Sequence, residues 1–120
     1  MELQQQVTNL ELSKRMKELG FKQESYFIWY LRNEETKKYI LCSRDIFQEG
    51  ISAYTVAELG EILNLGNLYI EEWRNGNGGK WCIELTDWKG KDKKTYNQEA
   101  ETEADARAKM LCYLKENNLL

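Results

Sequence analysis

The sequence predicts an α+β fold, with a mainly antiparallel sheet from two hairpins and three helices in the order α-β-β-α-β-β-(β)-α. Capping residues precede three amphipathic runs, and these predict the helices. Runs rich in aromatic and β-branched residues occur as pairs joined by polar turns, which indicates hairpins rather than βαβ units. Proline is absent and no linker divides the 120 residues. We therefore expect one domain over 1–120, with 1–8 as a polar lead that could be disordered.

The first helix is predicted over Asn9–Leu19. Thr8 and Glu11 have the spacing of a capping box, in which each side chain bonds the backbone of the other. Apolar side chains then recur at spacings of four and three, at Leu12, Met16 and Leu19. Gly20 follows the helix and tolerates the left-handed conformation that ends many helices.

The first hairpin is predicted from Ser25–Leu31 and Lys38–Arg44. Both runs are rich in aromatic and β-branched residues, and the polar stretch 32–37 separates them. Residues 45–54 show neither a helical nor a strand period, so we expect them to be irregular.

The second helix is predicted over Val56–Asn64. Thr55 and Glu58 repeat the capping-box spacing, and Leu59, Ile62 and Leu63 are expected to face inward. Gly60 lies inside this helix, where glycine is less favourable than alanine by about 1 kcal/mol. It either weakens the helix or marks a close packing contact.

The second hairpin is predicted from Leu68–Arg74 and Lys80–Trp88. Asparagine and glycine at 75–79 tolerate positive φ, as a tight turn requires. Lys93–Ala100 is a candidate third strand of the same sheet. A last helix is predicted within Thr102–Leu120, capped by Thr102, and its core side chains are Ala104, Ala108, Leu111 and Leu114.

Composition argues against several classes of function. The net charge is only −3, so no global field attracts the chain to nucleic acid or to an anionic membrane. The N-terminus lacks the layout of a signal peptide, and no apolar run approaches the ~20 residues that span a bilayer. We expect no membrane association and a cytoplasmic location.

The absence of histidine removes the commonest general base and the commonest metal ligand. Cys42, Cys82 and Cys112 are scattered among apolar neighbours, which predicts reduced packing thiols with raised pKa values. The chain has no GxSxG, no GxxxxGK[ST] and no DxDxDG-like loop. The sequence therefore predicts no catalytic residues, no metal site and no cofactor, which indicates a protein that is not an enzyme.

Three segments resemble small uncharacterised proteins of phages and prophages. They are VTNLELSKRMKELGFKQES at 7–25, SAYTVAELGEIL at 52–63 and ETEADARAKMLCYLKENNLL at 101–120. The second half is also similar in layout to phage-encoded α-β-α sandwich domains. The resemblance implies a fold and a location in the host cytoplasm, but it assigns no functional residue because the matching motifs are caps and apolar faces.

The second half also has the element order of a double-stranded RNA-binding domain. Six basic and three acidic residues lie between Arg74 and Lys94, a local net charge of +3. Such domains bind phosphates through a basic start of the final helix. Here Glu101, Glu103 and Asp105 occupy that position, where they complement the helix dipole and repel phosphate.

Aromatic and basic residues around the second hairpin are the candidate partner-binding residues. They are Trp73, Arg74, Lys80, Trp88, Lys89 and Lys91. Trp81 is expected to face the core with Ile83 and Leu85. Glu71 and Glu72 are neighbours on a strand, so they point to opposite faces and cannot act together on one substrate atom.

These observations predict a non-catalytic binding module, an accessory protein of a phage or prophage that engages a host protein. Its predicted surface combines exposed aromatic side chains with the basic hairpin. The alternatives are a counter-defence protein that sequesters a small ligand or nucleotide, or a weak nucleic-acid binder. A homodimer is compatible with each of them.

Overall fold

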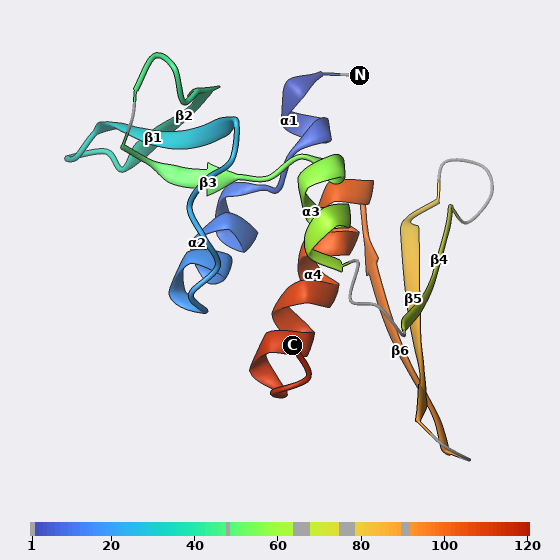
Figure 1. Cartoon of the computed structure of the whole chain (residues 1–120). Coiled ribbons are helices and arrows are strands. Elements are labelled where there is room, and N and C mark those ends of the chain that lie inside the picture. The colour runs from blue at the N-terminus through green and yellow to red at the C-terminus, as the bar shows by residue number, and fades with distance from the viewer. Residues whose placement is uncertain (1, 48, 64–67, 75–78, 90–91) are drawn as a thin grey trace.

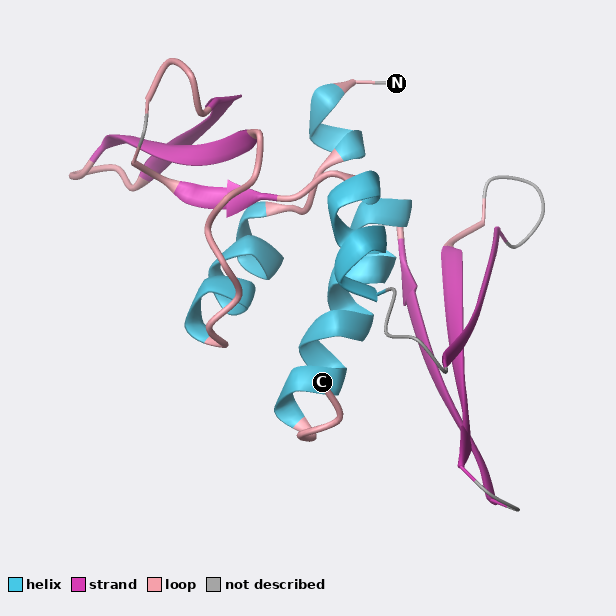
Figure 2. Cartoon of the chain, in the orientation of Figure 1, coloured by secondary structure: helices cyan, strands magenta, loops and turns pink. Residues whose placement is uncertain are grey.

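The computed structural model describes residues 2–47, 49–63, 68–74, 79–89 and 92–120, and only the backbone of residues 68, 69, 88, 89 and 92. Within these residues the chain forms two three-stranded antiparallel sheets and four helices (Figures 1 and 2). The α+β class is therefore confirmed. The predicted hairpins belong to two separate sheets, each completed by a third strand.

The N-terminal segment contains a short helix that was not predicted, α1 (Leu3–Gln6), before α2 (Leu10–Glu18). The N-cap of α2 is Asn9, whose side chain accepts a hydrogen bond from the Leu12 backbone nitrogen at 2.8 Å. The predicted Thr8 cap is wrong because Thr8 is buried and its hydroxyl accepts a hydrogen bond from the Tyr54 backbone. Gly20 follows α2 with φ +91°, as predicted.

The first sheet has the order β2-β1-β3, from β1 (Phe27–Asn33), β2 (Lys38–Ser43) and β3 (Ile51–Ala53). The predicted hairpin is confirmed, but β3 lies in a segment that was expected to be irregular. A three-residue strand has no detectable period, and its pairing with β1 stabilises it. The connection before β3 folds onto the sheet, where Phe47 stacks on Tyr30 with ring centroids 4.1 Å apart.

The second half consists of α3 (Val56–Leu63), β4 (Leu68–Arg74), β5 (Trp81–Lys89), β6 (Asp92–Ala100) and α4 (Glu103–Glu116). The strands form a sheet in the order β4-β5-β6, so the candidate third strand is confirmed. The predicted turn residues 75–78, and residue 64 at the predicted end of α3, lie outside the described residues.

Helix α4 lies at the centre of the molecule. Its four predicted core residues are buried, and Ala106, Met110 and Cys112 are buried as well. It packs against β5 and β6 on one side and against α2 and α3 on the other (Figure 1). One core cluster therefore contains side chains from Leu12 in α2 through Leu114 in α4. Helices α3 and α4 begin at the same end of the molecule (Figure 2).

Candidate functional site

The five predicted site residues whose backbone is described lie at the two ends of the second hairpin. Trp73, Arg74 and Lys80 lie where β4 ends and β5 begins, and the side chains of Arg74 and Lys80 are exposed. Trp88 and Lys89 end β5, which is roughly 26 Å long at the usual rise per residue. Their side chains, and all of Lys91, lie outside the described residues. The predicted residues therefore do not form one continuous patch.

Trp73 and Arg74 point to opposite faces of the sheet. Arg74 pairs with Trp81, whose ring packs against the core as predicted. Trp73 pairs with Cys82 on the other face, and 39% of its surface is exposed. The strand therefore places these two neighbouring candidates in different environments, on opposite sides of the sheet.

The face that carries Trp73 is here called the outer sheet face. Its described side chains are Glu71, Trp73, Cys82, Glu84, Thr86, Lys93, Thr95, Asn97 and Glu99, as the strand register shows. The described helices lie on the opposite side of this sheet (Figures 1 and 2). No described helix therefore packs on the outer sheet face, although Cys82 and Thr86 on its central strand are only 4% exposed.

Three carboxylates lie near Trp73 on the outer sheet face. Glu71 is two residues away on β4 and directly opposite Glu84 on β5. Glu99 lies opposite Cys82, the residue that Trp73 itself faces. Cross-strand neighbours are separated by about 5 Å and diagonal ones by about 7–8 Å between Cβ atoms. A group that stacks on Trp73 would therefore have carboxylates as neighbours on this face, whereas the sequence drew attention to the basic Arg74 and Lys80 at the same end of the hairpin.

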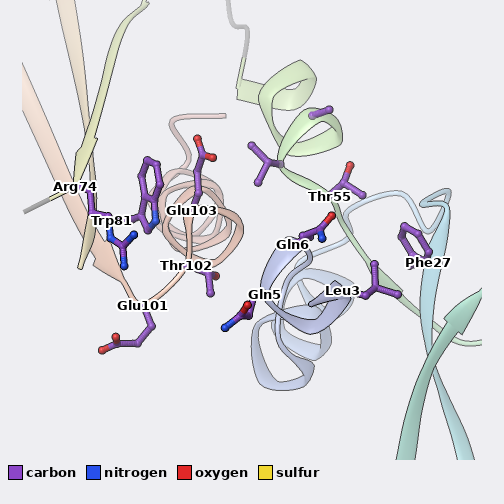
Figure 3. Close-up of a pocket in the computed structure, with 12 residues that line it drawn as sticks. Leu3, Gln5, Gln6, Phe27, Thr55, Arg74, Trp81, Glu101, Thr102 and Glu103 are labelled. Carbon is purple, nitrogen blue, oxygen red and sulfur yellow. The ribbon is translucent and has the colours of Figure 1, made fainter. Parts of the chain in front are cut away.

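A cavity of about 460 Å³ lies on the other side of the hairpin, where α3 and α4 begin (Figure 3). Arg74 and Trp81 border it from the sheet, Gln5 and Gln6 from α1, and Glu103 from α4. Arg74 also donates a hydrogen bond from Nε to the Gly79 carbonyl at 3.1 Å. The cavity mixes amides, one guanidinium and the carboxylates of Glu101 and Glu103, so it favours no single class of ligand.

An ionic cluster beside this cavity joins the sheet to the helices. Arg107 donates to both Glu72 oxygens, at 2.6 and 2.8 Å, and to the Val56 carbonyl at 2.9 Å. Burial raises the pKa of Glu72, but the hydrogen bonds and charge of Arg107 outweigh it and hold the pKa below its usual value. Burial and the nearby Glu72 raise the pKa of Glu103. The Arg107 guanidinium donates its hydrogen bonds to Glu72 and Val56, so the cluster stabilises the packing of α4 against β4 and α3.

The described residues contain no group of three side chains that could hold a metal ion. Burial raises the pKa of Cys42 and raises that of Cys112 to about 11, as the apolar neighbours predicted. Thiols with such values are poor nucleophiles at neutral pH. Among the described helices, none is long and apolar enough to cross a membrane.

The start of α4 has a structural role that the sequence did not reveal. Asp105 accepts hydrogen bonds from the backbone nitrogen of Asn9 at 2.8 Å and from its side-chain nitrogen at 3.2 Å. Burial raises the pKa of Asp105, and these hydrogen bonds offset part of the increase. The helix start that binds phosphate in double-stranded RNA-binding domains is thus acidic and already occupied, which weighs against the nucleic-acid alternative.

Comparison with protein-family models, with curated proteins and with solved structures finds no match to this chain. The candidate site is therefore defined by its geometry. Sequence reasoning identified Trp73 but missed Glu84 and Glu99. The sequence shows where Glu84 and Glu99 lie in the alternation of their own strands. Only the register between strands shows that both lie on the same face as Trp73.

Proposed function

We propose that the protein is a non-catalytic binding module that engages another protein through the outer sheet face. The exposure of Trp73 on a sheet face where no described helix packs carries this proposal. Tryptophan is enriched among the residues that dominate protein interfaces, because its large ring buries much area with little loss of conformational freedom. Exposed apolar side chains with polar neighbours are typical of interaction surfaces.

The carboxylates near Trp73 favour a basic protein segment as the partner. An arginine or lysine side chain stacked on the indole ring would gain a cation–π interaction. Glu71 and Glu84 lie within two positions of Trp73 on the same face, Glu99 lies one strand further, and their charge would attract the same cation. The resemblance of the sequence to phage and prophage proteins favours a host protein as the source of this segment.

The small-ligand alternative relies on the cavity that contains Arg74 and Trp81. Its lining does bring an aromatic ring and a cation together. The carboxylates of Glu101 and Glu103 border the same space, so an anionic nucleotide would meet repulsion there. We therefore propose protein binding as the first function. In the test below, a shift of the Trp81 indole signal would indicate ligand binding in the cavity instead.

The proposal can be tested by following tryptophan indole N–H signals in NMR spectra while a lysine-rich peptide is added. We expect the Trp73 signal, identified by Trp73→Phe, to shift in a saturable way. Trp73→Ala should weaken binding by at least about tenfold, as loss of an interface anchor does. Glu84→Gln should weaken it less and reduce its salt dependence.

Tyr26→Ala is the matched control, because Tyr26 is a 75% exposed aromatic residue directly before β1, far along the chain from the outer sheet face. It should leave peptide binding unchanged. A glutamate-rich peptide of equal length should not shift the Trp73 signal. The proposal is wrong if the Trp73 signal does not respond to the basic peptide, or if Tyr26→Ala weakens binding as much as Trp73→Ala does.

A further inference from the structure

We propose that the basic partner segment binds as an extended strand added to the edge of β4 that no described strand occupies. In this arrangement, side chains on one side of the added strand lie on the outer sheet face, and those on the other side enter a cavity between β4 and α3. This inference rests on the proposed function, for which it specifies the geometry of the complex and the pattern of the partner sequence.

Strand β4 ends its sheet, because the order is β4-β5-β6. Its seven residues contain neither proline nor lysine, and its inward-pointing carboxylate, Glu72, is paired with Arg107. The opposite edge strand, β6, carries exposed Lys93 and Lys94. The two edges thus differ in charge: β6 presents lysines, whereas the outer sheet face of β4 presents the carboxylate of Glu71.

A cavity of about 370 Å³ lies beside this edge on the inner side of the sheet. It is lined by Gly60, Glu61, Leu63, Ile70 and Arg107. Arg107 is held by Glu72 and Val56, and Leu63 and Ile70 provide an apolar wall. The cavity therefore suits an aliphatic side chain that approaches from the edge of β4.

An added strand would present its side chains alternately to these two environments. Side chains on the outer side would lie beside Glu71 and Trp73, where a basic group is favoured. Side chains on the inner side would lie near Ile70 and the cavity. The partner sequence that fits therefore alternates basic and aliphatic residues, and backbone hydrogen bonds provide further affinity.

A second copy of this chain fits the same edge poorly in the register that pairs all seven residues. That antiparallel two-fold pairing is centred on Glu71 and places its carboxylate opposite its own copy. Like charges directly opposite each other in antiparallel strands are destabilising. A basic segment from another protein replaces this repulsion with attraction.

The test compares three peptides of equal length and composition on the wild-type protein. In the first, lysine and valine alternate; in the second, the lysines and valines form two separate blocks; the third repeats the first with N-methylated backbone amides along one edge. We expect the alternating peptide to bind at least about tenfold more tightly than the other two, because only it provides both the side-chain pattern and the backbone donors.

Hydrogen exchange measured residue by residue provides an independent readout. The alternating peptide should slow exchange of alternate backbone amides in β4 by at least about tenfold, because those amides point away from β5 and gain acceptors. Amides of β6 should not slow. This measurement needs no variant, so misfolding cannot confuse it.

The outcomes separate this inference from the proposed function. If all three peptides shift the Trp73 signal equally and β4 amides are not protected, the outer sheet face binds basic segments but strand addition is wrong. If none of the peptides shifts the Trp73 signal, both proposals fail. If β4 becomes protected only as the protein concentration rises without peptide, the edge serves self-association and the inference is overturned.

Discussion

The carboxylate of Asp105 bonds both the backbone nitrogen and the side-chain nitrogen of Asn9, at 2.8 and 3.2 Å, across 96 residues of sequence. Asn9 is the N-cap of α2, and Asp105 lies in the first turn of α4. One carboxylate therefore joins the start of α2 to the central helix of the core.

Asp105→Ala should lower the free energy of unfolding by about 2 kcal/mol, because a nearly buried pair of hydrogen bonds to a charged group is lost. Urea denaturation measures this change. Glu101→Ala is the control, since Glu101 is exposed at the same end of α4 and should change stability by less than about 0.5 kcal/mol. Equal effects of the two substitutions would contradict the assigned role of Asp105.

Arg107→Leu should lower the free energy of unfolding at neutral pH by about 3 kcal/mol, because Glu72 would be left without its cation in a site where only 15% of its side chain is exposed. Urea denaturation over a range of pH measures the effect. Arg15→Leu is the control, since Arg15 pairs with Glu116 at an exposed site and should cost no more than about 1 kcal/mol.

The Arg107→Leu effect should depend on pH. In the wild-type fold the pKa of Glu72 is held below 4.5, so the stability from this pair is present above that pH and is lost as pH falls through the folded pKa. The difference between wild type and variant should therefore shrink as the solution is acidified. A difference that stays constant from neutral to acid pH would show that Arg107 acts by packing alone.

Gly60→Ala should destabilise the wild-type protein, although alanine favours helices by about 1 kcal/mol. A Cβ atom at Gly60 would collide with Nη1 of Arg107, which is hydrogen-bonded to the Val56 carbonyl. In the Arg107→Leu background the same substitution should become stabilising. The four unfolding free energies form a double-mutant cycle, and the absence of a change in sign would rule out this contact as the reason for glycine.

Tyr54 should titrate at unusually high pH. Its hydroxyl donates a hydrogen bond to the Lys22 carbonyl, and burial raises its pKa to about 12 from 10.0. The stability that depends on the neutral phenol is thus complete below pH 10 and is lost as pH approaches 12. Phenolate absorbance should show a late step that Tyr54→Phe removes, and a titration that Tyr54→Phe leaves unchanged would refute this prediction.

Much of the secondary structure follows from local patterns. Thr55 and Glu58 form the predicted capping box, with hydrogen bonds of 2.9 and 3.2 Å, and Thr102 caps α4 as predicted. These devices need only residues three apart, so they can be recognised in the sequence. The paired strand runs were visible for the same reason.

The sequence-based predictions were wrong where a contact between residues far apart in the chain determines the local structure. Thr8 and Asn9 are both residue types that can cap a helix. The Thr8 hydroxyl accepts a hydrogen bond from the backbone nitrogen of Tyr54, 46 residues away, and Asn9 therefore caps α2. Strand β3 forms because its backbone pairs with the edge of β1. Neither contact leaves a periodic signal between neighbouring residues.

By itself the sequence determined the α+β class, most of the helices and strands, and Trp73 as a candidate contact residue, because capping, turn formation and alternation are local properties. Tertiary structure decided that the hairpins form two sheets and that α4 is buried between helices and strands. It also decided the chemistry of the candidate site. The register of β4, β5 and β6 gathers Glu71, Glu84 and Glu99 around Trp73 and turns Arg74 to the other face. Register depends on pairing between segments far apart in the chain, which local patterns do not specify.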